Sequence, residues 1–338
     1  MYVIYHSSDT FAKVTGVSML SLFENNKSRK EIEVLYIQKG MTEKNREKLM
    51  AIAEQYGRKL TFLDMPDWAS IKNLTLKSCK SGWLGFGYNR LFLTEIVPEH
   101  IDRVLYLDSD TVIEDSLDDF WNIDFEDCYM AGVDDCLSSK YRKLVGLSED
   151  GVYCNSGVLL INLKKWREDN IEEQFISLMR EHNGYFVFNE QSILNSVFEG
   201  KIKIMPQQYN VNSLIYLYNY DELMRLRRPY NFSYTAEECE WAREHPVITH
   251  FTGNFYVLRR PWIESSDHPH KDAFLKYYRM TPWSEEPLDS ADSVKPDRKA
   301  SFCKKLPRRI MISSVSFIYN VLRPKHFKKE IKKHRSEG

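Results

Sequence analysis

Two aspartates, Asp108 and Asp110, follow a continuous apolar run and are separated by one serine. On an extended chain, residues two apart project to the same side, so the two carboxylates point the same way. Two neighbouring anions favour a hard divalent cation, which relieves their repulsion and keeps coordination positions open for the oxygens of a nucleotide diphosphate. The same tripeptide also occurs as a solvated turn, so its chemistry depends on where the fold places it.

The apolar run VLYL before these acids predicts a buried central strand. By pattern and turn residues, further strands are predicted at residues 2–5, 31–37, 59–65, 128–135, 153–162 and 246–251, and helices at residues 11–23, 43–57, 88–97, 171–182 and 190–198. Strands that alternate with helices indicate an α/β fold with a mostly parallel sheet. Ligands of such sheets bind beyond the carboxyl ends of the strands, which is where the two aspartates fall.

The composition is typical of a globular protein, with 43% hydrophobic and 28% charged residues among 338. The formal net charge of −1 hides an asymmetry, because Lys and Arg crowd the last forty or so residues. The body is therefore net acidic, which argues against nucleic-acid binding by the main domain.

The six cysteines show no CxxC pair and no zinc-finger spacing, so we expect reduced thiols in a cytoplasmic protein. The N-terminus lacks the basic and apolar regions of a signal peptide, and no apolar run approaches the ~18–20 residues that span a bilayer.

A shift to Pro, Ser and charged residues after about Thr281 predicts a linker. We expect a single domain over residues 1–280, a linker over 281–300 and a basic amphipathic tail over 301–338. The tail interleaves basic clusters with Ile, Met, Val, Phe and Tyr, as a helix lying on a membrane surface would. A solvated basic extension is the alternative.

Four segments, in this order, resemble blocks of the family 8 retaining glycosyltransferases: VLYLDSDTVIEDSLDDFW, NSGVLLINLKKW, FNEQSILNSVF and THFTG. The resemblance covers roughly residues 1–265. The family includes bacterial lipopolysaccharide glucosyl- and galactosyltransferases and glycogenin, and its Rossmann-like single-domain fold is called GT-A. The resemblance implies that fold here. Four ordered blocks are far more specific than one motif, although they leave the donor sugar open.

The resemblance implies that Asp108, Asp110 and His250 hold a metal ion, usually Mn²⁺, with Mg²⁺ as the alternative. A shell of carboxylate oxygens and one imidazole suits manganese. Taken alone, His250 would be read as a core histidine bonded to backbone.

The resemblance also places the loop after the first predicted strand at the uracil base, with Asp9 as hydrogen-bond acceptor and Phe11 as stacking face. The residues of this loop are Ser8, Asp9, Thr10 and Phe11. The alternative role of Ser8 or Asp9 is to cap the following helix, which is compatible with contact to the base. Arg90 corresponds to a family arginine near the donor, and an ion pair with a neighbouring acid is its alternative role.

The positions that the family uses to contact the donor sugar correspond here to Asp135, Asn155, Ser156 and Gly157. Asp134 is the alternative to Asp135. The family's usual Asp-Gln pair reads Glu190 and Gln191 here, with Gln191 expected beside the anomeric carbon. The alternative role of Glu190 is that of a helix-start residue favoured by the helix dipole.

After Gly253 the family closes its motif within a few residues as Lys-Pro-Trp, whereas this chain has a longer loop that ends in Arg260, Pro261 and Trp262. Arg260 is therefore our candidate for the group that holds the diphosphate, with Arg259 as competitor. An arginine supplies a bidentate phosphate contact, which a lysine does not.

The resemblance implies an enzyme that transfers a hexose, glucose or galactose, from a UDP-sugar to a saccharide or lipid-linked acceptor, with retention of configuration. We expect a role in bacterial cell-surface polysaccharide or lipopolysaccharide synthesis. The tail would attach the protein peripherally to the inner face of the cytoplasmic membrane. The alternatives are a non-catalytic UDP-sugar-binding protein and a sugar nucleotidyltransferase, whose Gly-rich N-terminal signature the chain lacks.

Overall fold

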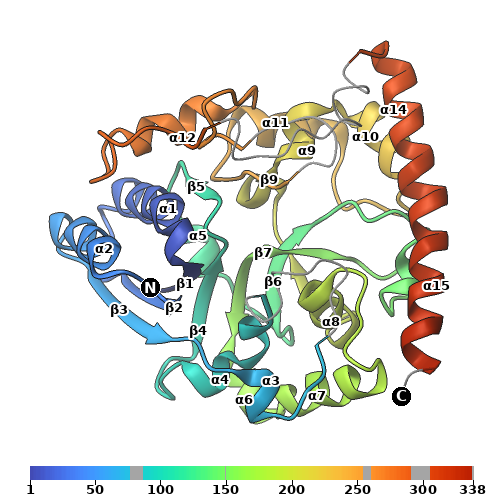
Figure 1. Cartoon of the computed structure of the whole chain (residues 1–338), viewed down its shortest axis with the longest axis horizontal. Helices are drawn as coiled ribbons and strands as arrows, with labels where there is room; N and C mark the ends of the chain where they lie inside the picture. The colour runs from blue at the N-terminus through green and yellow to red at the C-terminus, as the bar shows by residue number, and fades with distance from the viewer. Residues whose placement is uncertain (77–86, 149, 254–259, 291–304, 337–338) are drawn as a thin grey trace.

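A computed structural model describes residues 1–76, 87–148, 150–253, 260–290 and 305–336. Its strands form a seven-stranded sheet in the order β3-β2-β1-β4-β7-β6-β8 and a three-stranded sheet in the order β5-β10-β9 (Figure 1). The strands are β1 (Tyr2–Ser8), β2 (Glu33–Lys39), β3 (Lys59–Asp64), β4 (Arg103–Leu107), β5 (Thr111–Ile113), β6 (Met130–Asp134), β7 (Cys154–Asn162), β8 (Ile202–Ile204), β9 (Val211–Asn212) and β10 (Ile248–His250).

Most neighbouring strands of the large sheet run parallel: β1 with β2 and β4, β2 with β3, and β6 with β8. Only β7 opposes its neighbours β4 and β6 in the described sheet. The predicted α/β class with a mostly parallel central sheet is confirmed.

The helices cover both faces of this sheet. They are η1 (Asp9–Phe11), α1 (Ala12–Asn25), α2 (Glu43–Gln55), α3 (Trp68–Ile71), η2 (Gly87–Phe92), α4 (Leu93–Ile96), α5 (Asp118–Trp121), η3 (Arg142–Leu144), α6 (Leu163–Glu168), α7 (Ile171–Glu181), α8 (Asn189–Val197), η4 (Gln207–Asn210), α9 (Ser213–Leu217), α10 (Tyr220–Arg227), α11 (Ala236–Glu244), α12 (Lys271–Tyr278), α14 (Arg308–Phe317), η6 (Ile318–Leu322) and α15 (Arg323–Ser336). The single helix predicted at residues 88–97 is two short ones, because Phe92 leaves the helical region at φ −120° and ψ 30°.

The central strands are apolar on both sides because each face of the sheet is covered. In β4, Leu105 and Leu107 pack toward α1 and the small sheet, while Val104 and Tyr106 pack toward α4, α6 and α7. This alternation follows from the two-residue repeat of a strand. It holds the strand firmly and so fixes the position of the chain that leaves it at Asp108.

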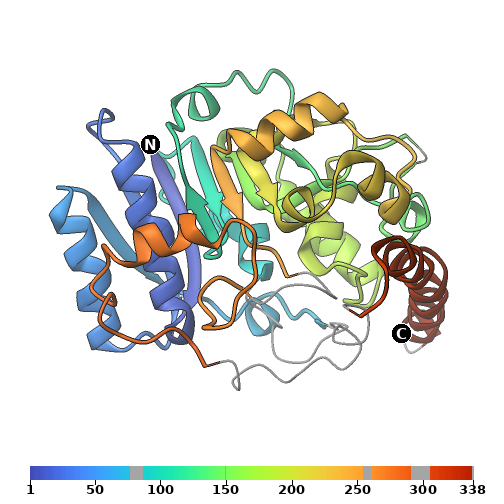
Figure 2. The same cartoon turned by 90° about the horizontal axis from the view of Figure 1, so that it is seen from above.

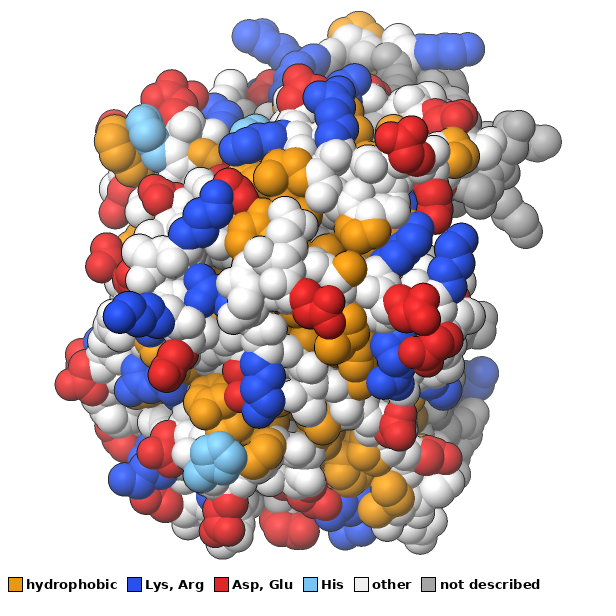
Figure 3. All heavy atoms as spheres, turned by 90° about the vertical axis from the view of Figure 1, so that its left-hand side faces the viewer, with side chains coloured by type: hydrophobic (Ala, Val, Ile, Leu, Met, Phe, Trp, Pro, Cys, Tyr) orange, Lys and Arg blue, Asp and Glu red, His pale blue; other side chains and the backbone are white. Residues whose placement is uncertain are grey.

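The first half of the expected linker, residues 281–290, packs on the body. Trp283 is 2% exposed, and a Cβ on Gly16 of α1 would lie 2.5 Å from its ring. Lys48 of α2 lies 2.6 Å from Glu286. On the side of the molecule that carries α1, α2 and α12, acidic and basic side chains are interspersed (Figure 3). The second half of the linker lies outside the described residues, and the division into domain, linker and tail stays a prediction.

The tail is helical, and α14, η6 and α15 follow one another along one side of the body (Figures 1 and 2). Its buried apolar residues face the protein: Met311, Ile312, Val315, Tyr319 and Phe327. The mixture of basic and apolar residues that indicated an interfacial helix therefore also serves packing within the chain.

Four cysteines, Cys128, Cys136, Cys154 and Cys239, are free thiols, and the other two lie outside the described residues. In the part of the chain that the structure describes, no helix combines the length and the apolar character needed to cross a bilayer.

Candidate functional site

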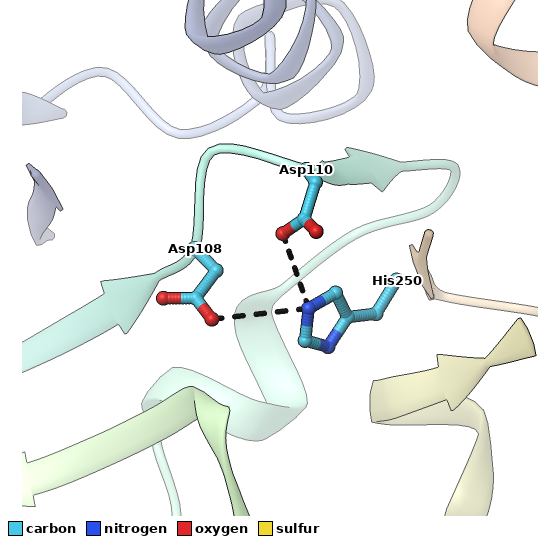
Figure 4. A group of neighbouring side chains, drawn as sticks. All are labelled: Asp108, Asp110 and His250. Carbon is cyan, nitrogen blue, oxygen red and sulfur yellow. Dashed lines mark ion pairs between the residues drawn. The ribbon is translucent and has the colours of Figure 1, made fainter. Parts of the chain in front are cut away.

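Asp108, Asp110 and His250 converge at the end of β4 (Figure 4). The chain leaves β4 of the large sheet at Asp108, turns, and enters the small sheet at β5. The antiparallel partner of β5 is β10, which places His250 opposite Thr111. His250 Nε2 lies 3.8 Å from Asp108 Oδ2 and 3.2 Å from Asp110 Oδ1. One donor atom from each residue lies within 4.8 Å of the others.

The opposite nitrogen of the imidazole is engaged by Asn210. His250 Nδ1 lies 3.1 Å from Asn210 Oδ1, and the amide nitrogen of Asn210 donates to Asn155 Oδ1 at 3.0 Å. Because the amide nitrogen of Asn210 donates to Asn155, its oxygen accepts from His250 Nδ1, and Nε2 is left facing the two carboxylates, where it would bind a metal ion after losing its proton. Sequence reasoning missed Asn210, since no motif surrounds it and only the pairing of β9 with β10 brings it here.

The donor set fits a divalent metal ion. Burial alone would raise the pKa of Asp110, but His250 and Arg260 outweigh it and hold the pKa below its ordinary value, so the carboxylate stays charged. Gly157 leaves the space for such an ion: a Cβ there would overlap His250 Cε1 and lie 2.7 Å from Asp108 Oδ2. Two carboxylates and one imidazole suit a cation between hard and borderline.

Arg90 pairs with the first aspartate. Its guanidinium donates to Asp108 Oδ1 at 3.0 Å and to the backbone oxygens of Gly87, at 3.2 Å, and Ser156. It also lies over the ring of Tyr106, 4.4 Å from the centroid. The side chain is 6% exposed. The ion pair that was the alternative role of Arg90 is therefore present, and it holds Asp108 in place.

Arg260 pairs with the second aspartate. Its NH1 donates to Asp110 Oδ2 and to the backbone oxygen of Phe251, and its guanidinium carbon lies 5.3 Å from the ring centroid of Trp262. The side chain is 31% exposed. Its competitor Arg259 lies outside the described residues. Gly253 permits this approach, since a Cβ there would lie 3.0 Å from Arg260 NH2.

The side chains predicted to contact the sugar are joined in one hydrogen-bonded network. Asp135 accepts from Asn155 Nδ2 at 3.3 Å and from Gln191 Nε2 at 3.1 Å. Gln191 Oε1 accepts in turn from the backbone and the hydroxyl of Ser156, at 3.0 and 3.1 Å. Asn155 links these hydrogen-bonded residues to Asn210 and so to His250. The sugar-side residues and the metal cluster are thus one connected network.

Asp134, the alternative to Asp135, points elsewhere. Its carboxylate accepts from the hydroxyl of Ser233 at 2.7 Å, from the backbone of Ser233 at 3.1 Å and from the backbone of Cys136 at 3.0 Å. Burial raises the pKa of Asp134 to about 6, although these hydrogen bonds oppose the shift. The geometry therefore favours Asp135 as the residue that faces the site.

Glu190 lies in the first turn of α8, 3.7 Å from Arg90 NH2. Burial raises its pKa, and Arg90 opposes that shift. Gly87 makes room for the longer acid, because a Cβ there would lie 2.5 Å from Glu190 Oε2. Both readings of Glu190, as helix-start residue and as site residue, are compatible with this position.

The expected uracil loop lies at the carboxyl end of β1. Asp9 Oδ1 accepts from the backbone and hydroxyl of Thr42, both at 2.8 Å, and from Asn45 Nδ2 at 2.9 Å, so Asp9 ties the loop to the start of α2. Ser8 makes no side-chain cap bond to the helix that follows. Its hydroxyl pairs with that of Thr10 at 2.9 Å instead.

Two further residues join this loop to the metal cluster, and sequence reasoning missed both. The ring of Trp262 contacts Phe11 edge-on, with centroids 5.8 Å apart, and also the guanidinium of Arg260. The backbone oxygen of His6 accepts from the hydroxyl of Ser109 at 3.2 Å. The loop, Arg260 and the two aspartates are therefore neighbours.

Comparisons with known proteins find similar sequences and similar structures. Residues 2–264 match the sequence model of glycosyl transferase family 8. General stress protein A of Bacillus subtilis (strain 168) is 24% identical over 288 residues, which cover 84% of this chain and 95% of that protein. A lipopolysaccharide 1,2-glucosyltransferase of Escherichia coli is 26% identical over 284 residues, covering 82% of this chain and 77% of the enzyme.

Among solved structures, the galactosyltransferase LgtC in complex with donor and acceptor sugar analogs superposes with a TM-score of 0.67 at 22% identity, covering 84% of this chain and 99% of that one. At this identity the likeness shows a shared fold.

Proposed function

The chain belongs to glycosyl transferase family 8, and on that premise we propose that it transfers a hexose from a UDP-sugar to a saccharide or lipid-linked acceptor. The family resemblance seen in the sequence is thereby confirmed. As a glycosyltransferase, the protein uses a nucleotide-sugar donor and an acceptor. Glucose and galactose are the proposed hexoses, and synthesis of bacterial cell-surface polysaccharide or lipopolysaccharide is the proposed role, in keeping with the similar lipopolysaccharide glucosyltransferase.

The observation that carries this proposal is the convergence of Asp108, Asp110 and Nε2 of His250 on one point. These three residues would hold Mn²⁺, with Mg²⁺ as the alternative. The bound ion would supply positive charge for the leaving diphosphate. Arg260 would donate to the same phosphates, and its planar fork suits two oxygens at once.

On the sugar side, Asp135 and Asn155 would fix the donor hydroxyls, and Gln191 would lie beside the anomeric carbon. Gln191 is held by Asp135 and Ser156, so its amide is pre-oriented. The acceptor hydroxyl would attack from the face that the nucleotide vacates, with retention of configuration. An amide is a poor nucleophile, and Glu190 is engaged with Arg90, so front-face attack is preferred to a covalent sugar intermediate.

At the nucleotide end, Phe11 would stack on uracil, while Ser8, Asp9 and Thr10 would meet its polar edge. Asp9 Oδ2 takes no hydrogen bond from the described residues, so it can still accept one from the base. Hydrogen bonds from Thr42 and Asn45 outweigh burial and hold the pKa of Asp9 below its ordinary value, so the acceptor is anionic at neutral pH.

The test is to incubate the purified protein with Mn²⁺ and a panel of UDP-sugars and to measure release of UDP and free sugar. One UDP-hexose should be hydrolysed preferentially, Asp110→Asn should abolish the release, and Asp115→Asn, at an exposed acid five residues away, should leave it intact. Binding of UDP-sugar without any turnover would favour the non-catalytic alternative, and formation of UTP from pyrophosphate would favour a nucleotidyltransferase.

We also propose peripheral attachment to the cytoplasmic membrane through the tail. The packed tail still exposes Ile310, Phe317 and Leu322. Its exposed lysines, which suit anionic lipid, are Lys325, Lys328, Lys329, Lys332 and Lys333. Binding to anionic vesicles should be salt-sensitive and should fall when Lys328, Lys329 and Lys332 are replaced by Gln. Equal binding by that variant would refute the attachment.

A further inference from the structure

Each aspartate of the metal cluster is already paired with an arginine: Asp108 with Arg90 and Asp110 with Arg260. Two adjacent carboxylates in a largely buried site need positive charge to offset their repulsion and their loss of water. The two guanidinium groups supply part of that charge in the metal-free protein, so a metal ion enters a site whose anions are partly neutralised.

The two arginines differ in how firmly they are held. Arg90 is 6% exposed and has two backbone acceptors, a second acid in Glu190 and the ring of Tyr106, so it stays in place whatever Asp108 binds. Arg260 is 31% exposed. Beyond Asp110, its contacts with the residues that the structure describes are one backbone oxygen and the face of Trp262. Arg260 is thus the one of this pair that can exchange its carboxylate for another anion.

With a metal ion bound, Asp110 would be shared between that ion and Arg260. Its Oδ2 accepts from Arg260, while its Oδ1 faces His250 Nε2, where the metal would sit. A metal on Oδ1 and a guanidinium on Oδ2 are like charges on one carboxylate, and each weakens the other's hold. A diphosphate that draws Arg260 away removes this repulsion and presents its own oxygens to the metal.

We propose that Arg260 forms an ion pair with Asp110 only while no nucleotide diphosphate is bound, and that it moves to the phosphates when one binds. This exchange of partners couples metal binding to nucleotide binding. The inference rests on the proposed function and adds the regulation of that site. Because coupling between two ligands is reciprocal, the metal raises the affinity for the nucleotide by the same factor. The protein then binds metal weakly when the nucleotide is absent.

The test is to titrate the full chain with Mn²⁺, with and without UDP, and to measure the concentration of free Mn²⁺ from its electron paramagnetic resonance signal. Arg260→Gln should bind Mn²⁺ about ten-fold more tightly than the wild type when UDP is absent, within the range of known coupling factors. UDP should then improve Mn²⁺ binding less in this variant than in the wild type. Unchanged Mn²⁺ affinity in nucleotide-free Arg260→Gln would overturn the proposal.

Two further variants separate charge from shape. Arg260→Lys keeps the positive charge and should bind Mn²⁺ nearly as weakly as the wild type; tightening equal to that of Arg260→Gln would overturn the charge argument. Arg309→Gln removes one exposed arginine from the tail and should change nothing. A wild type that hydrolyses no UDP-sugar would refute the proposed function, whereas the Mn²⁺ titrations judge the inference separately.

Discussion

His250 and Asn210 are joined by a hydrogen bond of 3.1 Å between Nδ1 of the imidazole and the side-chain oxygen of the amide. This bond orients the imidazole and aims Nε2 at Asp108 and Asp110. Since Asn210 itself donates to Asn155, the metal ligand and the sugar-side residues are oriented by one asparagine.

Asn210→Ala should therefore weaken metal binding without removing a ligand. We expect the Mn²⁺ affinity to fall by about 10- to 100-fold, the usual effect of losing a group that orients a metal-bound histidine. Mn²⁺ titration with a parallel thermal melt measures this. An unchanged affinity in a folded variant would show that Asn210 does not orient the ring.

Gly157→Ala should close the space between the metal ligands, because its Cβ would overlap His250 and approach Asp108. We expect loss of Mn²⁺ binding and of UDP-sugar turnover. Gly200→Ala is the matched control: Gly200 has a φ of +74° and no atom within 4 Å of a built Cβ. It should cost about 1–2 kcal/mol of stability from backbone strain and leave Mn²⁺ binding intact.

Asp134 should affect stability through its titration. Burial raises its pKa to about 6 in the folded protein from an ordinary value of 3.8, so the folded state keeps the proton to higher pH. The unfolding free energy then falls as pH rises between these two values, by about 3 kcal/mol from this one group. Urea denaturation between pH 4 and pH 7 should show this fall in the wild type relative to Asp134→Asn. Parallel curves for the two proteins would contradict it.

Tyr319 should anchor the tail to the body. Its ring lies 4.8 Å from that of Tyr141 and 4.4 Å from the guanidinium carbon of Arg227. Tyr319→Ala should cost about 3 kcal/mol, as other buried aromatic truncations do. Phe317→Ala, two residues away and 53% exposed, should cost under about 0.5 kcal/mol. Similar losses in both variants would mean that the tail is not held through Tyr319.

The sequence revealed those parts of the site that lie in contiguous blocks. Asp108 and Asp110 are two residues apart on one strand end, so their convergence follows from strand geometry alone. His250 was placed through family resemblance, and the pairing of β10 with β5 brings it to them. The roles of Asn210, His6 and Trp262 were missed because they arise from contacts between distant segments, which no local pattern encodes.

The fold was similarly readable where periodicity is strong. The strands and helices that were predicted lie near their observed positions, while α10, α11 and α12 were not predicted. The reversed direction of β7 was not predicted either, since a doubly buried strand has the same apolar pattern in either direction. For the tail, the helix was predicted but its partner was not. Its apolar residues predicted a helix with one apolar face, and sequence alone does not say whether membrane or protein covers that face.

Anomalous diffraction from crystals grown with Mn²⁺ and UDP tests the central claim most directly. We expect one strong peak in contact with a carboxylate oxygen of Asp108, a carboxylate oxygen of Asp110 and Nε2 of His250, each about 2.0–2.6 Å away, as for known divalent sites. A Mn²⁺ ion held by UDP alone, or bound with His250 Nε2 beyond coordination distance, would contradict it.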